Sequence, residues 1–221
     1  MGARKKILDA AERVFSEHGY SGASMRMIAA AADVSQALLH YHFRSKPQLY
    51  NDVFERRATE SVSFRLGSIE TLFAGGKVPE LDALIGVLFA SPPEWQHAEE
   101  PSFYFTPMVS ALAIGEDERS KEMMTRLYDP FAKRFIEALK QVVPALDHRS
   151  AVLAYMFALG VRVQVYARNG RIDRLSGSDD KVDPVEVSDK AIAFAGAGIR
   201  QIAARDSRPP LATADGGGRA G

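Results

Sequence analysis

Cysteine is absent from the 221-residue sequence. Its absence excludes disulfide bonds, thiolate metal sites and cysteine nucleophiles, and it fits a reducing compartment. Long hydrophobic runs are missing as well, since the longest apolar stretch, residues 151–161, has about half the length of a membrane span. The residues after Met1 enter an amphipathic pattern and not an apolar signal segment. These absences predict a soluble, cytoplasmic protein.

The chain has no excess of charge of either sign. Lys plus Arg and Asp plus Glu both total 28, so the net charge of 0 argues neither for nor against a nucleic-acid partner. The distribution is mildly uneven, because residues 1–57 hold about nine basic and six acidic side chains, which leaves the remainder near −3. The hydrophobic share of 46% and the charged share of 25% are ordinary for a globular chain.

Residues 7–15 begin the helical pattern, with apolar side chains spaced i, i+1, i+4, i+7 and i+8. Gly19 stands where a left-handed C-terminal cap belongs, so the first helix is expected to end there. Ser24 can cap a short second helix, and Ser35 a third that runs to about Phe43. The buried face of the second helix is predicted to comprise Met25, Ile28, Ala29 and Ala32.

A capping box at residues 45–48, Ser-Lys-Pro-Gln, predicts the start of a long fourth helix that continues to Gly75-Gly76. Beyond it the chain stays helical in pattern, with breaks at Val78-Pro79, Ser91-Pro92-Pro93, Glu100-Pro101, Ile114-Gly115 and Val143-Pro144. Asn169-Gly170 ends a further helix. A second capping box at residues 183–186 opens a last helix that reaches about Ala204.

The fold class that these patterns predict is all-α. Residues 161–166 alternate with period 2 and could form a strand, but helix is favoured because no turn separates them from the apolar run before. We expect a first domain over residues 1–57, a second, helical domain over 58–205 and a disordered tail over 206–221, which is rich in Pro, Gly and Ala.

Two short helices braced by longer ones form the helix-turn-helix architecture, which places a recognition helix in the DNA major groove. In the third helix, Val34, Leu39 and Phe43 can face inward. The side chains left to project outward are those of Gln36, Ala37, Leu38, His40 and Tyr41. Their short or planar groups suit contacts with base edges and phosphates.

Residues 4 to about 57 resemble the DNA-binding domain of the TetR family. The matching residues, in order, are Ile7-Leu8-Asp9-Ala10-Ala11, Phe15, Gly19-Tyr20, Ser24, Arg26, Ile28-Ala29, Ala32, Val34-Ser35, Leu39-His40-Tyr41-His42-Phe43, Ser45-Lys46 and Leu49. The chain departs from the family pattern at His40, where tyrosine is usual, at Asp33, where glycine is usual, and at Ala37, where glycine or proline is frequent.

This resemblance implies a set of DNA contacts. Phosphate contacts are implied for Ser24, His40, Tyr41, His42 and Lys46, the last beside the amides that open the fourth helix. Positions that approach bases in the family hold Arg26, Gln36 and Leu38, and the capping Ser35 lies beside them. Arginine can bind guanine, glutamine can bind adenine, and leucine can contact a thymine methyl group.

The resemblance identifies residues 1–57 as a DNA-binding domain and implies that residues 58–205 form an effector-binding and dimerisation domain. This second domain would hold an effector cavity and a homodimer interface made by the last two long helices. Small residues at positions 191, 193 and 195–198 would let a partner helix approach, although packing within the chain explains them too. Aromatic and methionine clusters, one of which includes Met156 and Phe157, suit an apolar or aromatic ligand. The candidate ligand residues are Trp95, Phe103, Tyr104, Met108, Met124, Tyr128, Phe131, Tyr155 and Arg162.

The predicted function is a DNA-binding transcriptional regulator, a repressor that a small apolar or aromatic effector releases from operator DNA. One alternative is a DNA-binding regulator without an effector, and a weaker one is an all-α enzyme. Residues 94–97 match the Glu-x-x-His unit of di-iron bundles, but the sequence has no second copy. His40 and His42 diverge by about 200° on a helix and cannot share a metal. No cofactor, metal site or catalytic residue is predicted.

Overall fold

The structure is a computed structural model that describes residues 2–95, 102–166, 171–177 and 183–207. Within these ranges it is all-α, as the sequence predicts, and has no strand. The α-helices are α1 (Ala3–Gly22), α2 (Met25–Ala31), α3 (Gln36–His42), α4 (Lys46–Leu72), α5 (Leu81–Phe89), α6 (Ser102–Ala113), α7 (Glu118–Leu127), α8 (Asp129–Val142), α9 (His148–Tyr166), α10 (Arg171–Ser176) and α11 (Pro184–Asp206). Two short 3-10 helices are η1 (Ala74–Gly76) and η2 (Pro93–Trp95).

The first four helices begin and end close to the predicted residues. Gly19 has a positive φ of 66°, as expected of a capping glycine, but α1 continues through this kink to Gly22. The side chains of Ser24, Ser35 and Ser45 accept hydrogen bonds from the backbone N–H groups of Met27, Leu38 and Gln48, so all three predicted N-caps are confirmed.

The capping box of α4 differs in one hydrogen bond. Gln48 Oε1 accepts from the backbone N–H of Arg44, at 3.0 Å, and not from that of Ser45 as a capping box predicts. The helix then runs without interruption to Leu72, just before Gly75, which has a φ of 76°. One continuous helix therefore connects the two predicted domains across residue 57.

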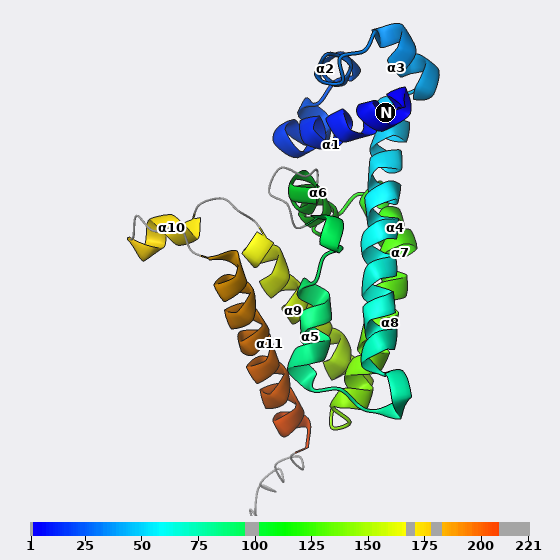
Figure 1. Ribbon diagram of the computed structural model, residues 1–221. Coiled ribbons are helices and arrows are strands. Elements are labelled where there is room, and N and C mark those ends of the chain that lie inside the picture. The colour runs from blue at the N-terminus through cyan, green and yellow to red at the C-terminus, as the bar shows by residue number, and fades with distance from the viewer. Residues whose placement is uncertain (1, 96–101, 167–170, 178–182, 208–221) are drawn as a thin grey trace, which may run out of the picture.

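Helices α5, α6, α7 and α8 of the second domain contact α4. Helix α9 contacts α8 and α11, and α5 packs on α11. Figure 1 shows α2 and α3 at one end of the molecule, α6 beside α1, and α11 running toward the opposite end. A single core of buried apolar side chains extends from Ile7 in α1 through Phe54 and Leu88 to Phe135 and Ile199 in α11.

Several details were not predicted from the sequence. The strand alternative for residues 161–166 is wrong, because they complete α9. A break at Tyr128, before Asp129-Pro130, separates α7 from α8, and α10 was not predicted either. Asp183 caps α11 through the backbone N–H of Val185, whereas Glu186 pairs with Lys190 and does not complete a capping box. The expected stop at Asn169-Gly170 and the tail from residue 208 lie outside the described residues.

Candidate nucleic-acid interface and effector site

The turn between α2 and α3 is tight because its backbone is held from both sides. Val34 N donates to Ala29 O at 3.0 Å, and Asp33 N donates to Ala30 O at 3.1 Å. Asp33 has a φ of 51°, and within the described residues no other non-glycine residue has a positive φ. This left-handed position explains why glycine is the usual residue here in the TetR pattern, and aspartate is one of the few other side chains that tolerate it.

The recognition helix α3 has one buried face and one exposed face. Leu39 and Phe43 are fully buried and Val34 is half-buried, as the pattern predicts. On the other face the exposed side chains are those of Gln36, Ala37, Leu38, His40 and Tyr41. Tyr41 is 82% exposed, an unusual degree for a large aromatic ring, while the neighbouring His42 is half-buried with its ring centroid 5.3 Å from that of Tyr41.

Residues from α2 extend the exposed face. Arg26 is exposed on this short helix, and the capping hydroxyls of Ser24 and Ser35 mark the N-terminal ends of α2 and α3. The structure thus places eight of the nine candidate DNA-contact residues on α2, α3 or their caps with exposed or partly exposed side chains: Ser24, Arg26, Ser35, Gln36, Leu38, His40, Tyr41 and His42.

Lys46 is bound within the protein. Its Nζ donates to the backbone oxygens of Ala23 at 2.7 Å and Ser21 at 3.4 Å, and it lies 4.6 Å from the centroid of the Tyr20 ring. The ammonium group therefore joins the start of α4 to the end of α1. Lys46 was expected to lie beside the first amides of α4. Its hydrogen bonds show that it also fixes the position of the segment that leads into α2.

Arg119 links the DNA-binding helices to α7. Its guanidinium lies 4.3 Å from the ring centroids of both Tyr20 and Tyr50, and it donates two hydrogen bonds to Asn51 Oδ1, at 3.0 and 3.3 Å. Burial raises the pKa of Tyr50 to about 12, while the charge of Arg119 acts in the opposite direction. Tyr20 thus contacts both Lys46 and Arg119.

A buried ion-pair network joins α1 to α4. Glu12 is fully buried and accepts from Arg57 Nε at 2.9 Å and from Arg56 Nη2 at 2.9 Å, and Arg56 also bonds Asp9 at 2.7 Å. Burial raises the pKa of Glu12, and the two arginines counteract it in part. The guanidinium of Arg57 lies 5.1 Å from the Trp95 ring, so the network reaches the helical domain.

The candidate effector residues are only partly brought together. Met108, Tyr128, Phe131, Tyr155 and Arg162 are buried, and Trp95 and Met124 are half-buried against the same core. The backbone of Phe103 and Tyr104 belongs to α6, but their side chains lie outside what the structure describes.

Two aromatic-cluster residues of α9 face outward, contrary to expectation. Met156 is 52% exposed and Phe157 is 61% exposed, because α9 buries Tyr155 and Ala158 instead. Leu153 lies three residues before Met156 and is also exposed, and Phe194 of α11, which packs against α9, is 70% exposed. We call these four exposed apolar side chains the α9–α11 face.

Packing within the chain accounts for half of the small residues of α11. Ala191, Ala195 and Gly196 are buried inside the protomer, and a Cβ atom at Gly196 would lie 2.5 Å from Asp82 Oδ1 of α5. Ala193, Ala197 and Gly198 are exposed, and nothing lies within 4 Å of a Cβ atom at Gly198. The interface expectation is therefore wrong for the buried three and stays a prediction for the exposed three.

Sequence reasoning missed Arg65 and Arg119. Arg65 is 5% exposed in the middle of α4, and its Nε donates to Ala90 O at 3.0 Å. Neither arginine interrupts a helical pattern or belongs to a motif. For Arg65 the available signal was its spacing, since it lies three residues after Val62 and four before Ile69, both of which face the core.

The described ranges hold neither a metal-binding cluster nor a membrane-spanning helix. There, no cluster of three or more His, Asp or Glu residues is placed to hold a metal ion. None of the helices described is both long and apolar enough to cross a membrane. Of the Glu-x-x-His unit, Gln96 and His97 lie outside the described residues.

Comparison with known proteins agrees with this architecture. Residues 7–53 match the family described as bacterial regulatory proteins, tetR family, and residues 87–198 match the tetracyclin repressor-like C-terminal domain. The chain is 26% identical over 164 residues to the transcriptional regulator AcrR of Shigella flexneri, covering 72% of this chain and 75% of AcrR. It is 43% identical over 60 residues to the transcriptional activator FasR of Mycolicibacterium smegmatis, 27% of each chain.

The fold is shared with solved structures of regulators. The FadR regulator of Bacillus subtilis, solved in complex with stearoyl-CoA, superposes with a TM-score of 0.60 at 15% identity and covers 88% of this chain and 98% of FadR. The helix-turn-helix residues, the helical domain that follows them and both family matches indicate the same family. The chain belongs to the TetR family of bacterial transcriptional regulators.

Proposed function

We propose that this regulator binds operator DNA as a homodimer, with α3 of each protomer in the major groove, and that a small apolar or aromatic effector releases it. The observation that carries the proposal is the exposed face of α3, where polar and aromatic side chains stand over a helix anchored by Leu39 and Phe43. Residues 1–57 act as the DNA-binding domain, 58–205 as the effector-binding and dimerisation domain, and 206–221 as a tail.

The DNA contacts divide into two kinds. Gln36 and Leu38 read bases, because they are exposed at the N-terminal part of α3, the part of a recognition helix that contacts base edges. Arg26 is exposed on α2 at a position that approaches bases in the TetR family, and its long side chain reaches a base edge from there. The phosphate contacts come from Ser24, Ser35, His40, Tyr41, His42 and Lys46. Phosphate contacts position a protein on the duplex without specifying sequence, whereas base contacts specify the site.

Dimerisation uses the α9–α11 face. Leu153, Met156, Phe157 and Phe194 expose large apolar side chains on two adjacent helices, and Gly198 leaves space for a partner helix. A two-fold dimer presents two recognition helices to half-sites about one helical turn apart, which compensates for the weak binding of one short helix.

Effector release is supported by the contacts between the two domains. Arg119 on α7 holds Tyr20 and Tyr50, and Arg57 on α4 contacts both Glu12 and Trp95. An effector that moves α6, α7 or α4 therefore acts on the DNA-binding helices by direct contact. The stearoyl-CoA complex of the related FadR fold supports an effector with a large apolar body. A regulator without an effector would keep the DNA contacts but show no such release.

The test begins with selecting a binding duplex from a random-sequence pool with the purified protein. Gln36→Ala should weaken binding to the selected duplex by about 1–3 kcal/mol and change binding to a scrambled duplex much less. Gln141→Ala, at an exposed glutamine of α8, is the matched control and should leave both affinities unchanged. Equal losses on the two duplexes would contradict the base-reading role of Gln36.

A further inference from the structure

Four buried polar side chains lie in the interior of the helical domain. Arg65 of α4 is 5% exposed, Tyr128 at the α7–α8 junction 9%, and Tyr155 and Arg162 of α9 are 7% and 9% exposed. Both arginines act electrostatically on both tyrosine hydroxyls, which places the four groups in one neighbourhood. We call them the arginine–tyrosine cluster.

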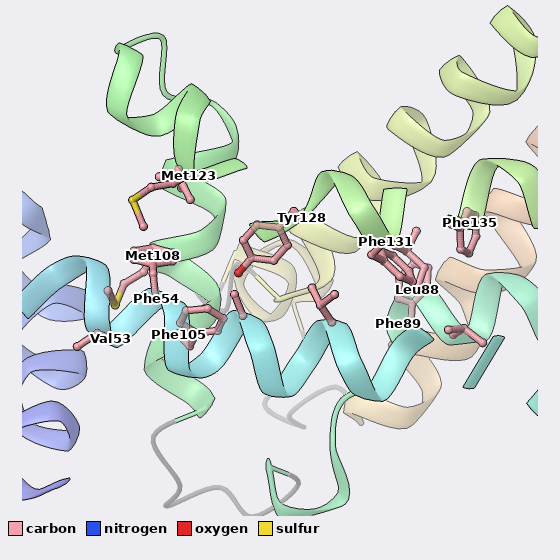
Figure 2. Close-up of a cluster of buried hydrophobic side chains, with 14 of the residues drawn as sticks. Val53, Phe54, Leu88, Phe89, Phe105, Met108, Met123, Tyr128, Phe131 and Phe135 are labelled. Atoms are coloured by element: carbon pink, nitrogen blue, oxygen red, sulfur yellow. The ribbon is translucent and has the colours of Figure 1, made fainter. Parts of the chain in front are cut away.

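The hydroxyl of Tyr128 is the group that points to a ligand. The side chain is nine-tenths buried, and its Oη has no hydrogen-bond partner among the described residues. Figure 2 shows the Tyr128 ring between Met108, Met123 and Phe131, with its oxygen directed toward α4. Burial raises the pKa of Tyr128 and that of Tyr155, the latter to about 12, so both remain protonated donors at neutral pH. A buried donor requires an acceptor.

The local charge decides which kind of acceptor fits. The charged side chains that are buried in the described ranges are Glu12, Arg57, Arg65 and Arg162. Glu12 and Arg57 bond each other at the α1–α4 contact, and the two remaining groups, both in the cluster, are cationic. The half-buried carboxylate of Asp129 also acts on Tyr155, so two cationic groups and one anionic group surround the tyrosines, and Arg65 Nε donates to Ala90 O. A negatively charged acceptor is favoured at such a place.

The surroundings of the cluster are apolar and adaptable. Phe54 and Phe105 pack with ring centroids 5.4 Å apart, and Met108 and Met123 are buried beside Tyr128 (Figure 2). Phe131 lies under Arg65, with the guanidinium 5.9 Å from its ring centroid. Methionine side chains change rotamer readily, so this part of the core can reshape around a hydrocarbon body.

We propose that the effector is an amphipathic anion, whose carboxylate or phosphate group binds the Tyr128 hydroxyl and the guanidinium groups of Arg65 and Arg162, and whose hydrocarbon chain lies among Phe54, Phe105 and the methionines. This inference rests on the proposed effector response and specifies its chemistry. The anionic group orients the ligand, and the apolar chain contributes most of the buried surface.

The experiment compares three probes with the same chain: dodecanoate, dodecyl phosphate and dodecanol, each below its micelle concentration. Binding to the full-length protein is measured by calorimetric titration and by thermal shift. We expect an anionic probe to bind at least ten-fold more tightly than dodecanol. The comparison of carboxylate with phosphate then identifies which head group the site prefers. Equal affinity for dodecanol and the better anion, or no binding of either anion, would overturn the proposal.

Variants connect the binding to the cluster. Tyr128→Phe removes one hydroxyl and should lower the affinity for the preferred anion about ten-fold, while Arg162→Met should lower it about 30-fold or more. Affinity for dodecanol should not change. Arg149→Met, at an exposed arginine of the same helix, is the control. Unchanged anion affinity in both cluster variants would refute the assignment, and Tyr128→Phe keeps this test valid if Arg162→Met fails to fold.

Operator binding in the presence of each probe separates this inference from the proposed function. If dodecanol alone binds and releases the duplex, the regulator responds to an apolar effector and the anionic site is wrong. If the anions bind through Tyr128 and Arg162 but leave operator affinity unchanged, the anionic site is supported and the proposed release fails.

Discussion

Replacing Arg119 by alanine should loosen the junction between the DNA-binding helices and α7. The guanidinium stacks 4.3 Å from two tyrosine ring centroids, and each cation–π contact at a partly exposed site contributes about 0.5–1 kcal/mol. Its hydrogen bonds to Asn51 contribute about 1 kcal/mol more. We therefore expect Arg119→Ala to lower the free energy of unfolding by about 2–3 kcal/mol, which lowers the melting temperature by about 5–10 °C in a chain of this size.

Urea unfolding at a fixed protein concentration measures this loss, because the stability of a dimer depends on concentration. Lys121→Ala is the control on the same helix: Lys121 pairs with Glu118 at the surface, and its loss should cost less than about 0.5 kcal/mol. Arg119→Lys keeps the charge but loses the planar stacking and should recover part of the stability. The reasoning is refuted if Arg119→Ala and Lys121→Ala unfold at the same urea concentration.

Three further predictions concern other contacts. Glu12→Ala removes the buried carboxylate of Arg57 and leaves it only the exposed Glu60, 3.2 Å away, so it should cost about 3 kcal/mol of unfolding free energy by urea titration. Asp9→Ala, at the half-buried end of the network, should cost less than about 1 kcal/mol. Lys46→Gln removes one charge from each protomer and should flatten the slope of log K against log salt by roughly 2 for the dimer; an unchanged slope would rule out a phosphate contact. Gly198→Arg, which meets open space within the protomer, should give monomers by light scattering with unchanged helix content, and a retained dimer mass would disprove the α9–α11 interface.

The DNA-binding helices could be predicted closely because their signals are local. Ser24, Ser35 and Ser45 cap the residues that follow them, and the period of the apolar side chains fixes which face of α3 is buried. The exposure of Gln36 and Tyr41 followed from the burial of Leu39 by helical geometry alone.

The residues that bond from one helix to a distant segment could not be found in this way. Arg119 is 68 residues from Asn51 in the sequence, and Arg65 is 25 residues from Ala90, so their partners are set by how helices pack and not by spacing along one helix. The small residues of α11 show the same limit. Their pattern is compatible with any close helix contact, and only the packing of α5 shows that Gly196 faces the chain itself while Gly198 does not.

Because α4 is one continuous helix, it can act as a lever arm that carries motion from the helical domain to the DNA-binding helices. Its 27 residues span about 40 Å at 1.5 Å per residue, from the capping Ser45 beside the recognition helix to the far end of the helical domain. Lys46 fixes the first turn of α4 to the end of α1, and Arg65 lies near the middle of the helix. If α4 tilts by about 3° about one end, its other end moves by about 2 Å. In the proposed homodimer, a displacement of this size in each protomer would change the separation of the two recognition helices relative to half-sites of fixed spacing.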